Sequence, residues 1–172
     1  REEDALMMAS DEPMAEISCT VNGQPVRAHV PLRQSLVDFV RHGLGLTGSH
    51  VGCEHGVCGA CHAVVDGRVV RGCLMLAVQG DGRTVTAIET DQPTAQMRAL
   101  QDTFFERAAL QCGFCTPGMI LQASELLTRT AAPTRAEIRD ALSGNYCRCT
   151  GYHAIVDAVE TAAARLRDKA AA

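Results

Sequence analysis

The sequence predicts an α+β protein with two successive parts, a small sheet crossed by one helix and then a bundle of four helices. Up to about Glu89, short alternating apolar runs are separated by turn dipeptides, which is typical of strands. After "TDQPT", four segments carry apolar residues at helical spacing and have visible caps. The cysteines divide in the same way, because each part has one cluster of four and only Cys19 stands apart.

Two hairpins are predicted in the first part, each around a turn dipeptide. "EISCTVNGQPVRAHV" has alternating runs on both sides of Asn22-Gly23, and "CHAVVDGRVVRGC" repeats this arrangement around Asp66-Gly67. Asn-Gly and Asp-Gly favour two-residue hairpin turns because these residues tolerate positive φ. A further strand, "TVTAIE", follows the turn "GDGR". Between the hairpins, "RQSLVDFVRHGLGL" has apolar residues at helical spacing and predicts one helix that ends near Gly43.

The second part is predicted to form four helices joined by short loops, at residues 94–109, 117–129, 135–142 and 153–168. Thr116 before Pro117 predicts an N-cap followed by proline at the first helical position. Thr134 with Glu137 three residues later predicts a capping box. Two helices carry apolar stripes that we interpret as core: Met119, Ile120, Ala123, Leu126 and Leu127 in one, and Ile155, Ala158, Val159, Ala162 and Leu166 in the other.

The composition excludes several classes of protein. The chain has 172 residues, of which 47% are hydrophobic and 21% charged, as in an ordinary globular protein. Its net charge is −4 and it has no block of Lys or Arg, so nucleic-acid binding is not expected. No apolar run is long enough for a membrane span.

The domain organisation is read from the change of pattern near residues 90–93. We expect one domain at residues 16–91 and a second at residues 92–172. Residues 1–15 are acidic and polar, so we expect a flexible tail there rather than a secretory signal. The cytoplasm is then the expected compartment, where cysteine clusters bind metal more often than they form disulfides.

The first cysteine cluster, Cys53, Cys58, Cys61 and Cys73, has the spacing C-x4-C-x2-C-x11-C. A C-x4-C-x2-C loop with a remote fourth cysteine is the plant-type ferredoxin pattern for a [2Fe–2S] cluster. The two irons share two sulfides and each needs two thiolates, so one loop delivers three sulfurs and a neighbouring strand the fourth. Glycines suit this loop because they reach left-handed conformations and let backbone N–H groups approach sulfur. Zinc and disulfides are the alternatives, but structural zinc prefers two short pairs.

The second cluster, Cys112, Cys115, Cys147 and Cys149, is ambiguous by spacing alone, because C-x2-C…C-x-C also suits zinc. Cys112 and Cys115 precede the expected start of a helix, whose N-terminal dipole favours thiolates. Cys147 and Cys149 precede Thr150, a candidate cap for the last helix. Residues two apart in an extended segment point the same way, so both sulfurs of "CRC" can reach one centre.

Three segments, "GCEHGVCGAC", "QCGFCTPGMI" and "NYCRCTGYHAIVDAV", resemble the small iron–sulfur subunit of the molybdenum hydroxylases, the xanthine oxidase family. The resemblance extends from about Ile17 to Leu166. It implies a β-grasp, plant-type ferredoxin-like domain followed by a C-terminal four-helix bundle domain, each with one [2Fe–2S] cluster. All eight clustered cysteines are then the implied metal ligands. One departure is His153-Ala154, where relatives often have Gln-Asn or Arg-Pro.

The same resemblance implies an electron-transfer subunit of an oxidoreductase. A large subunit would carry a molybdopterin cofactor and a medium subunit FAD, in a dimer of heterotrimers. Electrons would pass from the molybdopterin through the helical-domain cluster and the ferredoxin-domain cluster to FAD or another acceptor. Gln111 and Cys149 are implied to contact the pterin, and a loop hydrogen bond is the alternative role for Gln111.

No catalytic residue is expected in the chain, because it has no Ser-His-Asp order, phosphate loop or dinucleotide-binding fingerprint. We interpret His50, His55 and His62 as non-ligands, since four cysteines already complete the nearby site. His153 is expected to be a surface residue, and Cys19 to pack in a strand as a small hydrophobe. A free-standing two-cluster electron carrier or redox sensor, and a structural zinc protein, are the alternative functions.

Overall fold

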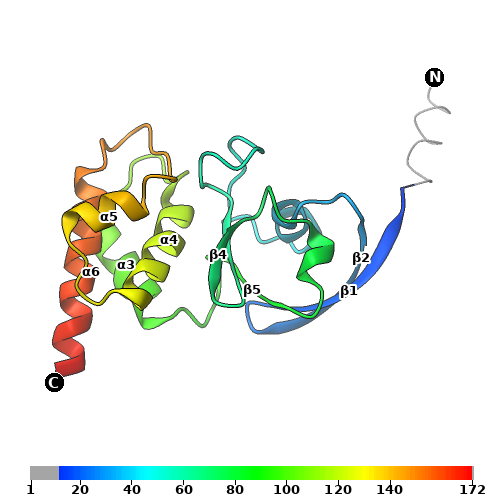
Figure 1. Ribbon diagram of the computed structural model, residues 1–172, viewed down its shortest axis with the longest axis horizontal. Helices are drawn as coiled ribbons and strands as arrows, with labels where there is room; N and C mark the ends of the chain where they lie inside the picture. The colour runs from blue at the N-terminus through cyan, green and yellow to red at the C-terminus, as the bar shows by residue number, and fades with distance from the viewer. Residues whose placement is uncertain (1–11, 172) are drawn as a thin grey trace.

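The computed structural model describes residues 12–171, and it has a sheet half and a helical half that lie side by side (Figure 1). The first strands, drawn in blue, and the last helix, drawn in red, lie at opposite ends of the molecule. The predicted α+β class is confirmed. Within residues 12–171, none of the helices combines the length and apolar character that crossing a membrane requires.

The sheet half contains five strands: β1 (Met14–Val21), β2 (Gln24–Pro31), β3 (His62–Val65), β4 (Arg68–Arg71) and β5 (Thr84–Thr86). Their order is β2-β1-β5-β3-β4, with β1 and β5 parallel and the other neighbouring pairs antiparallel. Both turns are where the sequence predicts them: φ is 49° at Asn22 and 82° at Gly23, and 48° at Asp66 and 79° at Gly67. Because a type I′ turn requires positive φ at both residues, local turn chemistry sets both hairpin registers.

The helix between the hairpins is short and changes type along its length. α2 (Leu36–Asp38) continues into the π-helical turn η1 (Phe39–Gly43), which ends at the predicted glycine. Ser35 caps α2, because its side-chain oxygen accepts a hydrogen bond from the Asp38 N–H at 3.1 Å. The buried side chains of this segment join the core of the sheet half: Leu36, Phe39 and Val40.

Two strand boundaries differ from the sequence-based expectation. β5 ends earlier than predicted, because the Ala87 N–H donates to the Asn22 side-chain Oδ1 at 2.8 Å and not to a neighbouring strand. β1 begins at Met14, inside the segment 1–15 that is expected to be a tail. Residues 1–11 of that segment lie outside the described part of the chain.

The helical half contains α3 (Ala95–Glu106), α4 (Thr116–Arg129), α5 (Arg135–Ala141) and α6 (His153–Ala171). α3 and α5 each pack against both α4 and α6. The predicted capping box of α5 is confirmed: Thr134 Oγ1 accepts from the Glu137 N–H at 3.2 Å, and the Glu137 carboxylate accepts from the Thr134 N–H at 2.7 Å. Both predicted apolar stripes lie in the core of this half, where only Leu166 is partly exposed.

The other two predicted caps are wrong. Thr116 is the first residue of α4 and not its cap, because Cys115 before it already has helical backbone angles (φ −83°, ψ −16°). Among the described residues, the buried Thr116 hydroxyl has no hydrogen-bond partner. Thr150 lies outside α6, and its hydroxyl accepts from the Tyr152 N–H at 3.2 Å instead of from the first turn of the helix.

The two halves meet where α4 begins beside the loop of the first cysteine cluster. Gly118 has no room for a side chain, because a Cβ there would lie 2.1 Å from the backbone oxygen of Gly59. The His62 Nδ1 lies 3.4 Å from the Gly118 carbonyl oxygen. Farther along α4, Arg68 pairs with Glu125 at 3.0 Å. Backbone approaches backbone at this junction, so the spacing between the halves depends on glycine.

Gly118→Ala is expected to lower the free energy of unfolding by about 1–3 kcal/mol, because the new Cβ would collide with backbone that cannot rotate away. Urea denaturation followed by circular dichroism measures this change. The matched control is Gly80→Ala in the 3-10 turn η2 (Ala77–Gly80), where the nearest atom to a Cβ is the Leu36 Cδ1 at 3.9 Å. Equal stability of the two variants would contradict the prediction.

Candidate metal centres

The first cysteine cluster is built from a loop and the β3–β4 hairpin. Cys53 and Cys58 lie in the loop, and Cys61 ends it directly before β3. Cys73 follows β4 and returns beside Cys61, because the Gly72 N–H donates to the Cys61 carbonyl at 3.0 Å. One loop therefore supplies three sulfurs and the segment after a neighbouring strand supplies the fourth, as the sequence predicts.

Left-handed backbone curls the loop around the sulfurs. Glu54, Gly56 and Gly59 have φ values of 57°, 77° and 72°. Two features require glycine at position 59. Its backbone is left-handed, and a Cβ there would lie 2.7 Å from the Gly144 carbonyl oxygen. The loop of the first cluster can therefore reach its curled form and its contact with the helical half only with glycine at this position.

The thiols of the first cluster form two pairs. The side chains of Cys53 and Cys58 interact with each other, and so do those of Cys61 and Cys73. The two pairs lie near each other, since the charge of Cys73 contributes to raising the pKa of Cys58. A two-iron cluster needs two thiolates for each iron, so this grouping of the sulfurs fits a [2Fe–2S] cluster.

Hydrogen bonding and burial shift the pKa values of these thiols in opposite directions. Backbone N–H groups, led by that of Cys58, lower the pKa of Cys53 to about 6. The Cys58 and Val57 nitrogens lie 3.4 and 3.3 Å from the Cys53 Sγ. Burial raises the pKa of Cys61 to about 11. Because metal ligation requires thiolates, a metal group bound by both sulfurs at neutral pH would displace a proton from Cys61 but not from most Cys53 side chains.

The second cysteine cluster joins the segments before α4 and α6. Cys112 and Cys115 lie between α3 and α4, and Cys147 and Cys149 between α5 and α6. The sulfurs of Cys112 and Cys149 lie 3.6 Å apart, and the side chains of Cys115 and Cys147 interact with each other. The first of these pairs is exposed and the second is half-buried. We name them the outer pair and the inner pair.

Burial is the main influence on the Cys115 thiol, whose pKa is raised and not lowered as the sequence-based expectation of a favoured thiolate implies. Burial, followed by the hydrogen bond with Cys147, raises the pKa of Cys115 to about 12. Burial also acts to raise the pKa of Cys147, but hydrogen bonds from Thr150 and from the backbone outweigh it and the pKa is lowered. The Thr150 Oγ1 lies 3.1 Å from the Cys147 Sγ. Thr150 therefore contacts a thiol of the site, a role that the sequence does not reveal.

The donor set of both centres fits iron–sulfur groups. Within residues 12–171, no three His, Cys, Asp or Glu side chains converge so as to hold a single metal ion. Each cysteine cluster consists instead of two pairs of sulfurs, one pair for each iron of a [2Fe–2S] cluster. All eight cysteines that the sequence selects are brought together in these two groups of four.

Two of the histidines near the first cluster connect the halves of the molecule. The His50 ring stacks on Phe114 with a centroid distance of 4.6 Å, and its Nδ1 lies 2.8 Å from the Phe114 carbonyl oxygen. His62 is buried and its Nδ1 lies 3.3 Å from the Asn145 side-chain nitrogen. His55 is exposed. Sequence reasoning missed the bridging roles of His50 and His62, because both depend on contacts with residues more than fifty positions away.

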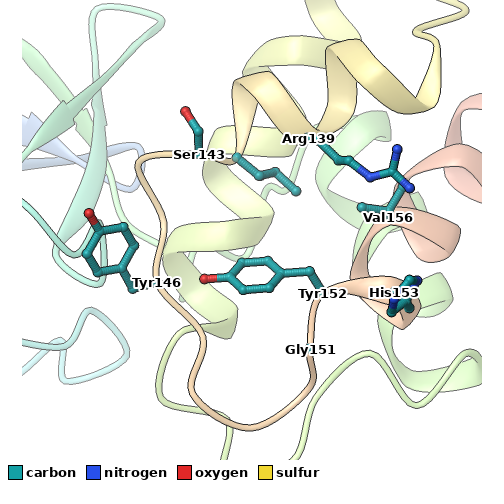
Figure 2. A pocket seen from close by; sticks show the side chains of 8 residues that line it. Arg139, Ser143, Tyr146, Gly151, Tyr152, His153 and Val156 are labelled. Atoms are coloured by element: carbon teal, nitrogen blue, oxygen red, sulfur yellow. The ribbon is translucent and has the colours of Figure 1, made fainter.

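The other residues of interest lie in core or surface positions. Cys19 is buried in β1 within the core of the sheet half, as predicted. Gln111 is exposed next to the outer pair. His153, the first residue of α6, is exposed as predicted. It lines a pocket of about 330 Å³ together with Tyr146 and Tyr152 (Figure 2).

The loops that carry the two cysteine clusters contact each other directly. The Tyr146 N–H, next to Cys147, donates to the carbonyl of Cys58 at 2.9 Å. The Asn145 side-chain amide donates to the Gly59 carbonyl at 3.4 Å. One backbone hydrogen bond therefore connects Cys58 of the first cluster to Tyr146, the residue that precedes Cys147 of the second cluster.

Comparison with known proteins identifies both halves. Residues 19–87 match the 2Fe-2S iron-sulfur cluster binding domain, and residues 84–160 match the [2Fe-2S] binding domain. The chain is 47% identical over 160 residues to the nicotine 6-hydroxylase small subunit of Paenarthrobacter nicotinovorans, which covers 93% of this chain and 96% of that protein. These matches confirm two [2Fe–2S] binding domains.

Solved structures share the same arrangement of sheet and helices. Quinoline 2-oxidoreductase from Pseudomonas putida 86 has a chain that matches with a TM-score of 0.84 and 44% identity, over 90% of this chain and 97% of that one. Aldehyde oxidoreductase from Desulfovibrio gigas matches with a TM-score of 0.83 and 42% identity, over 91% of this chain but 18% of that longer one. The predicted ferredoxin-like half followed by a helical half is thereby confirmed. The chain belongs to the family of small [2Fe–2S] subunits of the molybdenum hydroxylases, the xanthine oxidase family, and it is a subunit of an oxidoreductase complex.

Proposed function

We propose that this chain relays electrons from a molybdopterin site in a large subunit to FAD in a medium subunit or to another acceptor. A [2Fe–2S] cluster supplies one-electron transfer between its two oxidation states. In this proposal electrons enter at the second cysteine cluster, pass to the first and leave from the sheet half. The large and medium subunits are proposed partners, as is the pairing of two such heterotrimers.

The proposed ligands are the eight paired cysteines, with one [2Fe–2S] group in each half. The sheet half, proposed as a domain at residues 16–91, would use Cys53, Cys58, Cys61 and Cys73. The helical half, proposed as a domain at residues 92–172, would use Cys112, Cys115, Cys147 and Cys149. The pairwise grouping of the thiols and the two separate apolar cores support this assignment.

The observation that carries the proposal is the hydrogen bond from the Tyr146 N–H to the Cys58 carbonyl. It joins the two cysteine loops directly through their backbones. Nearby, the close contact of Gly118 with Gly59 leaves no room for a side chain on Gly118. A small carrier with two independent clusters would not need its cluster loops in contact. A relay needs short, fixed spacing between its centres, and this junction supplies it.

The exposed outer pair supports entry of electrons at the helical half. Cys112, Cys149 and the adjoining Gln111 are all exposed, so a partner subunit can reach them. An amide side chain offers both a donor and an acceptor, which suits the polar edge of a pterin. We therefore propose that Gln111 and Cys149 contact the pterin.

Exposed apolar side chains support exit at the sheet half. Val57 and Leu74 are 40% and 62% exposed, and both lie at the loop of the first cysteine cluster. Cys53 is in the same loop, with its sulfur 3.3 Å from the Val57 nitrogen. Large exposed apolar side chains around a redox centre suit a surface that another protein covers, which we propose to be the electron acceptor.

The proposed ligand assignment is tested by metal analysis of the purified protein. We expect about four irons and four acid-labile sulfides per chain, and two distinct EPR signals after reduction, because the two environments differ. Cys115→Ser should remove about half of the iron and one signal. Cys19→Ser is the matched control, since Cys19 lies in the core of the sheet half; it should retain all the iron and lose about 1 kcal/mol of stability. Loss of iron from the Cys19 variant would overturn the assignment.

Gln111→Ala is expected to retain both clusters and the assembled complex but to slow reduction of the irons by substrate about tenfold, because pterin contact positions the donor. The relatives named above suggest N-heteroaromatic compounds and aldehydes as substrates to screen. Stopped-flow bleaching of the visible absorption measures the rate. Dithionite should reduce the variant as fast as the unaltered protein.

The control for this experiment is Gln24→Ala, an exposed glutamine at the turn end of β2 in the sheet half. It should leave both rates unchanged. Reduction of the Gln111 variant by substrate at the unaltered rate would assign Gln111 to the loop alone and remove the proposed pterin contact.

A further inference from the structure

We propose that Tyr152 is a positioning residue for the second cysteine cluster, and that its hydroxyl fixes the segment carrying Cys147 and Cys149. This inference rests on the proposed function only in assuming that these cysteines hold a [2Fe–2S] group. It concerns a side chain outside the ligand set, at the start of α6.

A single hydroxyl holds both sides of this segment. The Tyr152 Oη accepts a hydrogen bond from the Cys147 N–H at 2.8 Å and donates one to the Asn145 carbonyl at 3.3 Å. A phenol has one donor hydrogen and can accept as well, so one oxygen makes both bonds. The backbone on either side of Tyr146 is thereby tied to the beginning of α6.

The backbone of Tyr152 is itself in an unfavourable conformation. Its φ of 69° is left-handed, which is uncommon for a residue with a bulky side chain. The Tyr152 N–H donates to Thr150 Oγ1 at 3.2 Å, and that oxygen lies 3.1 Å from the Cys147 Sγ. Both the backbone and the side chain of Tyr152 therefore act on Cys147, one through Thr150 and the other through the peptide N–H.

The ring of Tyr152 spans the inside of the loop. Figure 2 shows it extending from the start of α6 across the 143–152 segment, while the ring of Tyr146 lies on the other side of that segment. These are the two tyrosines of the chain, and both line the same pocket. Tyr146 is 54% exposed, and within residues 12–171 its hydroxyl makes no hydrogen bond. The chain thus supplies a matched control for the Tyr152 hydroxyl.

The hydroxyl determines what the Cys147 N–H can do. Backbone N–H groups near an iron–sulfur group tune its potential by hydrogen-bonding to sulfur. Here the Cys147 N–H is held by the Tyr152 Oη instead. Removing the oxygen leaves this part-buried donor without its partner, which is unfavourable. The freed Cys147 N–H would turn towards a sulfur of the cluster, which would stabilise the more negative reduced state. Otherwise the segment that carries Cys147 and Cys149 would shift.

The test is Tyr152→Phe, which keeps the ring and removes only the oxygen, with Tyr146→Phe as control. Both variants are purified as the full chain within its complex. We measure iron content, the unfolding temperature, and the EPR signals and midpoint potentials of the two clusters. In the Tyr152 variant we expect an upward shift of the second-cluster potential and an altered signal, with the first cluster unchanged. The Tyr146 variant should match the unaltered protein in every measurement.

The outcomes separate a positioning role from a merely structural one. Selective loss of the second cluster from the Tyr152 variant would also support the proposal, because it places the defect at Cys147. Equal loss of both clusters, or a lower unfolding temperature with unchanged signals and potentials, would overturn it. If the unaltered protein lacked two [2Fe–2S] signals, the ligand assignment in the proposed function would fail instead.

Discussion

The structure depends on the contact between two stretches of backbone, the glycine-containing loop of the first cysteine cluster and the start of α4. Gly118 lies too close to the Gly59 carbonyl oxygen to accept a side chain, and the Gly144 carbonyl oxygen excludes a side chain from Gly59. This contact brings the Cys58 carbonyl to the Tyr146 N–H, and so places one cysteine loop against the other. The polar side chains that surround it, His62 and Asn145, are buried and contact one another. The proposed relay between two centres rests on this junction more than on either half alone.

The thiols divide according to their surroundings, and this has consequences for assembly. Backbone N–H groups stabilise the Cys53 thiolate, whereas burial keeps Cys61 and Cys115 protonated. Ligands must be deprotonated to bind metal, so insertion of the clusters releases protons from the interior of the protein. Cys112 and Cys149 are exposed and form the accessible side of the second cysteine cluster. In the proposed ligand assignment, metal binding is therefore coupled to proton release at Cys61 and Cys115.

Local chemistry explains which features the sequence predicts. Turn residues set the registers of both hairpins, and the Thr134–Glu137 capping box forms because its partners are three residues apart. The cap predicted at Thr116 fails because Cys115 before it already adopts helical backbone angles. The early end of β5 depends on the distant Asn22 side chain. Cysteine spacing places the eight clustered sulfurs in two groups of four, although it leaves the metal of the second group ambiguous. The bridging residues between the halves leave no periodic or motif signal.

Solvent exposure decreases across the second cysteine cluster, so the cluster has an accessible side and a covered side. Its outer pair is exposed, its inner pair is half-buried, and Tyr146 beyond the inner pair reaches the first cysteine loop. In the proposed relay, an electron that enters through the outer sulfurs would move towards the contact between the loops and away from solvent. The network from Thr150 through Tyr152 to Asn145 lies on this inner side. In that proposal, substitutions there would act on the spacing and surroundings of the relay, whereas substitutions at the exposed edge would act on the approach of the donor.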